Sequence, residues 1–200
     1  STTLGLQWQW QANYKYSFYS LENSQLKLYT KKFVSEDIRT LYDLPNLLTQ
    51  MMQMPVFDAT IKVSLKADTV KDQCGLAITG KEYHYVSLIA EEDGKYIQFV
   101  EGREQGNGSM ERIKIKRKVE TDTIYLRASM YNEANVLEDG IGQLSYSLDG
   151  VHFEKIGLPF YTYPGGWVGA KIGLFAANFA VSHSKGYALF DYIEIEEGNH

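Results

Sequence analysis

The segment Thr60-Ile-Lys-Val-Ser-Leu-Lys66 decides the fold class of this chain. Its apolar residues Ile61, Val63 and Leu65 alternate with polar residues. In an extended chain, successive side chains point to opposite faces, so this pattern places the three apolar side chains together. It predicts a half-buried strand in an antiparallel sheet, with one face toward a core and the other toward solvent.

Alternating runs of the same kind recur through most of the chain, separated by glycine, asparagine and aspartate. Asp93-Gly94 and Asp149-Gly150 each stand between two runs, and Asp-Gly is a strong signal for a tight hairpin. The spacing predicts an all-β protein, an antiparallel β-sandwich of the jelly-roll type. The runs lie at residues 75–79, 83–90, 96–100, 112–118, 123–131, 143–148, 151–156, 171–175 and 187–196.

Two segments outside these runs carry local predictions. Residues 35–48 begin with a serine that suits a helix cap, but Pro45 limits any helix there to a short one. Near the start of the chain, Leu6, Trp8 and Trp10 alternate with glutamines. Exposure of two neighbouring tryptophans is unfavourable, so we expect this face to be buried.

Residues 101–110 contain three glycines and are expected to form a mobile loop. The run that follows, residues 112–118, alternates basic and apolar residues. That alternation is typical of an edge strand or a strand with one solvated face. The one cysteine, Cys74, lies in a strand-like apolar run and is expected to be a buried thiol, so the fold must form without a disulfide.

Composition restricts the remaining function classes. The 200 residues, 44% hydrophobic and 22% charged, suit one domain over residues 1–200, with residues 1–3 and 197–200 as tails. A net charge of −5 disfavours nucleic acid as a partner, since that affinity needs clustered lysines and arginines. The longest apolar stretch, residues 172–181, is too short to cross a bilayer, so no membrane partner is expected.

Motifs for catalysis and for cofactors are absent from the sequence. Carboxylates gather at residues 91–96 and 194–197, but the first group contains the Asp93-Gly94 turn and the second is typical of a solvated strand face. No serine elbow, Cys/His metal spacing or phosphate-binding loop occurs. We therefore predict no catalytic pair and no cofactor, although loop oxygens in a sandwich are compatible with a structural Ca²⁺.

Aromatic residues offer a different kind of site, because pyranose rings stack on tyrosine and tryptophan while their hydroxyls bind polar side chains. Three places have this character: a pair in the run 83–90, a mixed face in the run 123–131, and the aromatic loop 160–167. The alternative is that these rings form tyrosine ladders or packed corners. The candidate carbohydrate-binding residues are Tyr83, Tyr85, Tyr125, Arg127, Tyr161, Tyr163 and Trp167.

Six segments, taken in order, resemble a known family. They are LGLQWQWQAN at 4–13, PNLLTQ at 45–50, GLAITG at 75–80, SYSLDG at 145–150, GWVGAKIGLF at 166–175 and GYALFDY at 186–192. Together they are similar to the C-terminal concanavalin A-like domain of family 43 glycoside hydrolases of the β-xylosidase type. Related modules are also classed in carbohydrate-binding module family 91. The resemblance runs from Leu4 to about Glu196 and implies a concanavalin A-like jelly roll.

The resemblance also implies a role and two partners. In that family a five-bladed propeller carries the catalytic carboxylates, and the sandwich packs against it, so the resemblance implies a domain that does not hydrolyse glycosides alone. The partners implied are the propeller and a plant cell-wall polysaccharide of the xylan or arabinoxylan type. Residues 176–185, with Phe179 and His183, are the candidate propeller contact. Leu189 departs from the acidic residue expected before Phe190-Asp191, which weakens any polar or metal role there.

Three hypotheses remain at this point: the accessory module, a sandwich glycoside hydrolase or lyase acting in its own right, and a lectin-like adhesion domain. A carboxylate pair about 5–10 Å apart on a concave face would favour the second. A loop Ca²⁺ site or a protein-binding rim would favour the third. A lone cysteine fits a bacterial cytoplasmic protein and fits a periplasmic or secreted one equally well.

Overall fold

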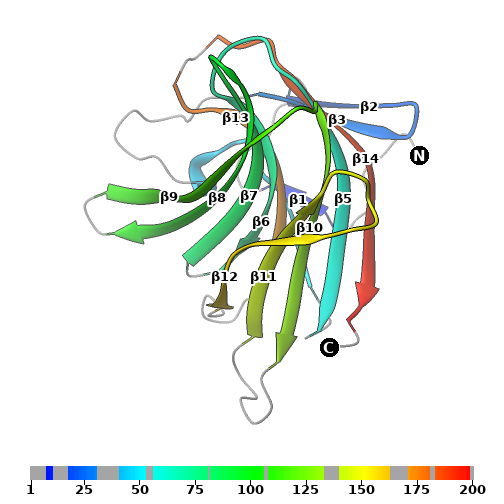
Figure 1. Cartoon of the computed structure of the whole chain (residues 1–200), viewed down its shortest axis with the longest axis vertical. Helices are drawn as coiled ribbons and strands as arrows, with labels where there is room; N and C mark the ends of the chain where they lie inside the picture. Colours follow the sequence, from blue (N-terminus) through cyan, green and yellow to red (C-terminus); the bar gives the residue numbers. More distant parts are fainter. Residues whose placement is uncertain are drawn as a thin grey trace.

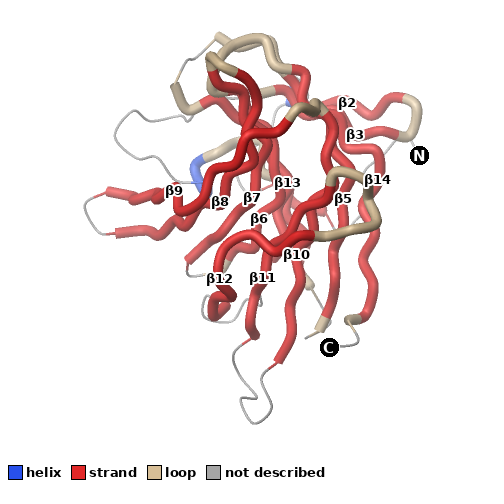
Figure 2. The backbone as a smooth tube through the Cα atoms, viewed as in Figure 1, coloured by secondary structure: helices blue, strands red, loops and turns tan. Residues whose placement is uncertain are grey.

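The computed structural model describes residues 8–10, 18–30, 41–52, 56–80, 82–105, 108–132, 140–162, 171–180 and 183–198. Within these ranges, fourteen strands form two antiparallel sheets of seven strands each. Figure 1 shows the sheets as two layers, with the ends of β8 and β9 extending past the other strands on one side. Figure 2 shows how little of the described chain lies outside strands.

Sheet A has the strand order β1-β4-β13-β6-β7-β8-β9. Its strands are β1 (Trp8–Trp10), β4 (Leu48–Met51), β13 (Lys171–Asn178), β6 (Asp72–Thr79), β7 (Glu82–Glu91), β8 (Gly94–Gln105) and β9 (Gly108–Val119). The basic run 112–118 lies in β9, so the prediction of an edge strand is confirmed.

Sheet B has the strand order β12-β11-β10-β5-β14-β3-β2. Its strands are β12 (Glu154–Thr162), β11 (Gly140–Ser147), β10 (Thr123–Asn132), β5 (Phe57–Lys66), β14 (Tyr187–Glu197), β3 (Gln25–Tyr29) and β2 (Tyr19–Glu22). Both Asp-Gly segments connect hairpins, between β7 and β8 and between β11 and β12.

The main core lies between the two sheets and follows the alternation in the sequence. Ile61, Val63 and Leu65 of β5 are buried in it, and so is Cys74 of β6. Trp8 and Trp10 pack against its margin, half-buried, while Gln9 is exposed, as the alternation of that segment predicts. The predicted sandwich architecture is confirmed.

The predicted mobile loop at residues 101–110 is wrong. Its described parts, residues 101–105 and 108–110, are the end of β8 and the start of β9, and the two strands stay in register from Glu101 opposite Arg112 to Gln105 opposite Gly108. Gly102 serves packing here, because a Cβ at this position would lie 2.1 Å from Cζ of Tyr83. Of the segment predicted to be partly helical, the described part holds a 3-10 helix, Leu41–Asp43.

Candidate functional site

Tyr83 and Tyr85, two of the candidate sugar-binding residues, are enclosed in a second core on the outer face of sheet A. Both rings are fully buried. The Tyr85 ring meets Phe175 edge-on at 5.0 Å between centroids, and Leu41 and Leu44 belong to the same cluster. A sugar cannot reach these rings, so the prediction that they bind a glycan is corrected. Residues 41–47 cover this face of sheet A. The alternating pattern of β7 shows which residues share a face, but it does not show that a distant segment covers that face.

A carboxylate joins the two tyrosines. The Tyr83 hydroxyl donates to Glu111 Oε1 at 2.6 Å, and the Tyr85 hydroxyl donates to Oε2 at 3.0 Å. Burial raises the pKa of the Glu111 carboxyl, and the two hydroxyl donors oppose that shift. Burial also raises the pKa of both tyrosines, so each remains a hydrogen-bond donor. The outer face of sheet A is thus a closed structural network.

The outer face of sheet B is open and polar. Strand register sets its side chains in rows across the sheet. One row runs from Lys155 on β12 through Ser145, Arg127 and Thr60 to Glu194 on β14. Neighbouring strands lie about 4.8 Å apart, so the residues of a row are within reach of one another.

A groove of about 480 Å³ crosses this face, and we call it the sheet-B groove. Arg127 is held by two contacts in this groove: Nε donates to Thr60 Oγ1 at 2.9 Å, and the guanidinium lies 3.7 Å from the centre of the Phe153 ring. Both Tyr125 and Arg127 were predicted from sequence, but Arg127 alone lines the groove. The lining residues are Asp58, Arg127, Ser129, Tyr131, Gln143, Ser145, Phe153 and Lys155.

The floor of the sheet-B groove is formed by short polar side chains that are almost fully buried. Gln143 and Ser145 are 4% and 6% exposed. Gln143 Nε2 donates to the Leu144 carbonyl at 2.9 Å, which fixes its amide. In the adjoining row, Ser129 Oγ donates to Asp58 Oδ1. The floor of the groove therefore consists of hydrogen-bonding groups that are fixed in place. The Arg127 guanidinium, packed on the Phe153 ring, lies above them.

Tyr125 lies beside the groove, one row away from Arg127. Its ring is half-buried against the 148–153 loop, since a Cβ on Gly150 would meet the ring at 2.8 Å. The exposed Tyr192 ring is 6.5 Å away, centroid to centroid. A hydrogen bond from Lys62 to Asp191 raises the pKa of that lysine and fixes it near both rings. Tyr125 and Tyr192 thus form a pair of aromatic rings beside the sheet-B groove.

The other predicted residues lie apart from the groove or outside the described residues. Tyr161, on β12, is 49% exposed. Tyr163 and Trp167 fall outside the described residues. Phe179 is half-buried against the second core, and His183 is exposed beyond it, in the segment between β13 and β14.

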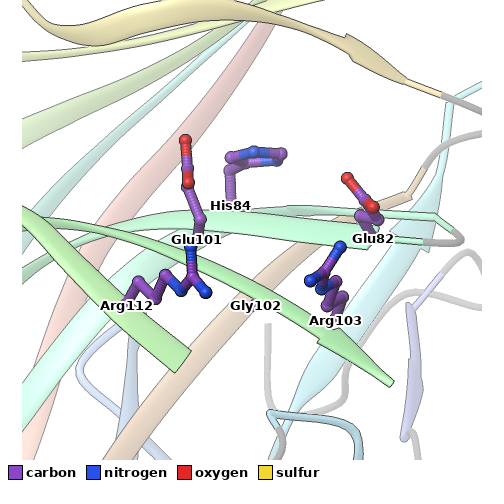
Figure 3. Close-up of a pocket in the computed structure, with 6 residues that line it drawn as sticks. All are labelled: Glu82, His84, Glu101, Gly102, Arg103 and Arg112. Atoms are coloured by element: carbon purple, nitrogen blue, oxygen red, sulfur yellow. The ribbon is translucent and has the colours of Figure 1, made fainter. Parts of the chain in front are cut away.

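A second pocket is lined by residues of β7, β8 and β9 in sheet A. Figure 3 shows the His84 ring between the carboxylates of Glu82 and Glu101. Burial lowers the pKa of His84 to about 4, and its ring stacks on Phe160 at 3.7 Å. Glu82 is register partner to Arg103 and Glu101 to Arg112, so charges of opposite sign alternate across the strands. The pocket is lined by Glu82, His84, Glu101, Gly102, Arg103 and Arg112.

The described residues hold neither a metal-ligand cluster nor a membrane-spanning helix. No group of three or more histidine, cysteine, aspartate or glutamate side chains there is placed to hold a metal ion. The fully buried carboxylate of Asp72 accepts from Thr69 N at 3.0 Å and from Asn178 Nδ2 at 2.9 Å. In the same ranges, no helix has the length and apolar character needed to span a bilayer.

Two seven-stranded antiparallel sheets with a groove across one outer face define a concanavalin A-like β-sandwich. A family model described as "Beta xylosidase C-terminal Concanavalin A-like domain" matches residues 1–196. The chain belongs to this family, the C-terminal sandwich domains of glycoside hydrolase family 43. The resemblance predicted from the six sequence segments is confirmed.

Individual relatives agree with the family. A Xylanibacter ruminicola protein named "Putative beta-xylosidase" is 29% identical over 170 residues, which are 85% of this chain and 28% of that protein. The structure of a bifunctional GH43-CE protein of Bacteroides eggerthii superposes with a TM-score of 0.82 at 25% identity, over 98% of this chain and 24% of the other. The structure of a family 43 protein of Bacillus licheniformis superposes with a TM-score of 0.77 at 22% identity, over 98% of this chain and 38% of the other. The chain thus spans well under half of each relative.

Proposed function

We propose that this domain is a non-catalytic accessory module of a family 43 glycoside hydrolase of the β-xylosidase or arabinofuranosidase type. In this proposal the sheet-B groove binds a xylan-type polysaccharide, while a separate surface packs on the catalytic propeller. The observation that supports binding is the open groove, in which Arg127 and Tyr131 stand over Gln143 and Ser145. Sugar hydroxyls need such donors and acceptors, and pyranose faces need nearby aromatic rings.

The groove chemistry favours binding over hydrolysis. Glycoside hydrolysis ordinarily needs two carboxyl groups on either side of the scissile bond. Asp58 is the one carboxylate among the residues that line the groove, and Ser129 donates a hydrogen bond to it. The carboxylates of the second pocket, Glu82 and Glu101, each have an arginine as a register partner. Each carboxylate therefore has an arginine beside it in the pocket, a setting typical of ion pairs at a protein surface.

The proposed contact with the propeller involves Phe179 and His183. They lie between β13 and β14, away from the groove residues in sequence and on the segment that joins the two sheets. Phe179 is half-buried and His183 exposed, so both retain surface for a partner. In a titration with a family 43 catalytic propeller, we expect NMR shifts at these two residues and none at Arg127.

Glycan binding is tested by adding xylohexaose to the ¹⁵N-labelled domain, with cellohexaose as the control sugar. The proposal expects saturable, xylan-selective shifts at Arg127, Ser129 and Ser145. The variant Arg127→Ala should abolish them, whereas the matched variant Arg112→Ala, an exposed arginine of the second pocket, should leave them unchanged. Shifts confined to Arg112 or Glu101 would place the glycan site in the second pocket instead of the sheet-B groove. A lack of shifts with every sugar would contradict glycan binding.

Catalysis is tested on the same samples. The proposal expects no xylobiose release from xylohexaose over a day at high domain concentration. Turnover that survives purification and disappears in Glu82→Gln or Asp58→Asn would contradict the non-catalytic role. Those two variants would also show which pocket is responsible, because each removes a carboxylate from one pocket and leaves the other pocket unchanged.

A further inference from the structure

The sheet-B groove contains two cations that no carboxylate of the described residues contacts. Arg127 and Lys155 flank the nearly buried Ser145 in a single row. Within the described part of the chain, neither takes part in an ion pair. Four cations of β9 differ, because each contacts a carboxylate: Lys114, Lys116, Arg117 and Lys118. Among the described residues, the groove thus holds two cations without an ion-pair partner.

The geometry of Arg127 suits a planar anion. Thr60 takes the Nε–H, and Phe153 holds one face of the guanidinium, so its two terminal nitrogens remain for a ligand. Arginine presents these N–H groups as a fork that matches a carboxylate in two parallel hydrogen bonds. Because the side chain is already fixed, little conformational entropy is lost on binding.

Negative charge in the face lies on the opposite flank. Asp58 and Glu196 are register partners on β5 and β14, and Glu194 closes the far end of the Arg127 row. These carboxylates repel an anion from that side, whereas Lys155 attracts it from the β12 side. An acidic group on a bound glycan is therefore directed to the space between Arg127 and Lys155, above Ser145.

We infer that the sheet-B groove selects glycans that carry a carboxylate, of the kind a uronic acid branch places on a xylan-type backbone. The inference rests on the proposed glycan binding and adds to it the substrate class. The carboxylate is bound by the terminal nitrogens of Arg127, and Lys155 adds a second positive charge.

The test compares three probes with one backbone: an unbranched xylooligosaccharide, the same chain with one glucuronic acid branch, and the methyl ester of that branch. Calorimetry should show the free acid binding at least about tenfold tighter than the other two, a typical strength for a charge-assisted pair. The advantage should shrink at about 0.5 M NaCl, since salt screens such pairs. Equal affinity for acid and ester would overturn the inference.

Variants place the effect. Arg127→Gln should remove the advantage of the acid, Lys155→Gln should reduce it, and Arg112→Gln should leave it intact. If Arg127→Gln is unfolded by circular dichroism, Lys155→Gln and the ester decide the matter, because Lys155 is exposed and its replacement leaves the fold intact. Unselective binding of all three probes in the groove would leave the proposed function standing and sink this inference. Absence of binding by any probe would sink both.

Discussion

The outer faces of the two sheets carry the same kind of sequence and have opposite fates. Tyr83 and Tyr85 alternate along β7 as Tyr125 and Arg127 alternate along β10. The first pair is fully buried with Phe175, whereas the second remains partly open beside the sheet-B groove. Alternation fixes the side of a strand on which a residue lies. Whether a distant segment then covers that side is decided by the tertiary fold.

The sharpest way to test this contrast is to remove a tyrosine from each face. Tyr85→Ala should lower the free energy of unfolding by about 3–5 kcal/mol, because it empties a fully buried ring site and leaves Glu111 short of a donor. Tyr125→Ala should lower it by less than about 1 kcal/mol. Urea denaturation of both variants measures the difference, and equal losses would mean that the two faces are equally covered.

Acid should lower the free energy of unfolding, because His84 on β7 of sheet A is buried without a proton. Its pKa is about 4 in the folded chain and about 6.5 when unfolded, so between these values the unfolded chain holds a proton that the folded chain lacks. The free energy of unfolding should therefore fall as the pH drops from about 6.5 toward 4, by up to about 3 kcal/mol. His84→Phe keeps the stack on Phe160 and should remove this part of the fall.

Chemical denaturation at pH 7, 5.5 and 4.5 checks that expectation. Glu82 and Glu101 face the same pocket, so Glu101→Gln is the appropriate companion variant. An unchanged pH dependence in His84→Phe would assign the acid sensitivity to carboxylates elsewhere.

A smaller loss is expected from Gly102→Ala, about 1–3 kcal/mol, because the new methyl group would overlap the rigid, buried Tyr83 ring. Gly140→Ala is the matched change on sheet B. Its nearest neighbour is the flexible end of Met130, so we expect a loss of under about 1 kcal/mol. Thermal melts of the two variants measure this difference. A lower melting temperature for Gly140→Ala than for Gly102→Ala would contradict the prediction.

The smallest effect on stability should come from Arg127→Gln, within about 0.5–1 kcal/mol, since Arg127 is partly solvated and makes one hydrogen bond to a neutral partner. The same variant is expected to have the largest effect on glycan binding. If Arg127→Gln instead destabilised the domain as strongly as Tyr85→Ala, the arginine would be a structural support and the groove argument would fail.

Local pattern was sufficient for most strands and for the inward faces, although β2, β3 and β4 were not predicted. Ile61, Val63 and Leu65 are in the core, and Asp149-Gly150 lies in the turn of its hairpin. It failed at residues 101–110, where glycine serves close packing under a tyrosine ring rather than mobility. Hairpin pairing of β8 with β9 decided that segment, and pairing partners are not visible in local composition.

The candidate site was found in part. Arg127 was identified by its alternation with apolar residues, but Gln143, Ser145, Phe153 and Lys155 were missed. Gln143 and Ser145 were visible as the polar half of the run 143–148, and attention to aromatic residues alone passed over them. Phe153 and Lys155 reach the groove only because β12 pairs with β11 and its preceding loop folds back over β10.

Cys74 is a built-in probe of how often the domain opens. It is the single cysteine of the chain, it is fully buried at the centre of sheet A, and its burial raises the pKa of the thiol. A disulfide reagent attacks the thiolate, so labelling must wait for sheet A to open. The labelling rate of the untouched protein therefore reports how often its two layers separate, and a ligand held on sheet B should slow it without approaching the sulfur.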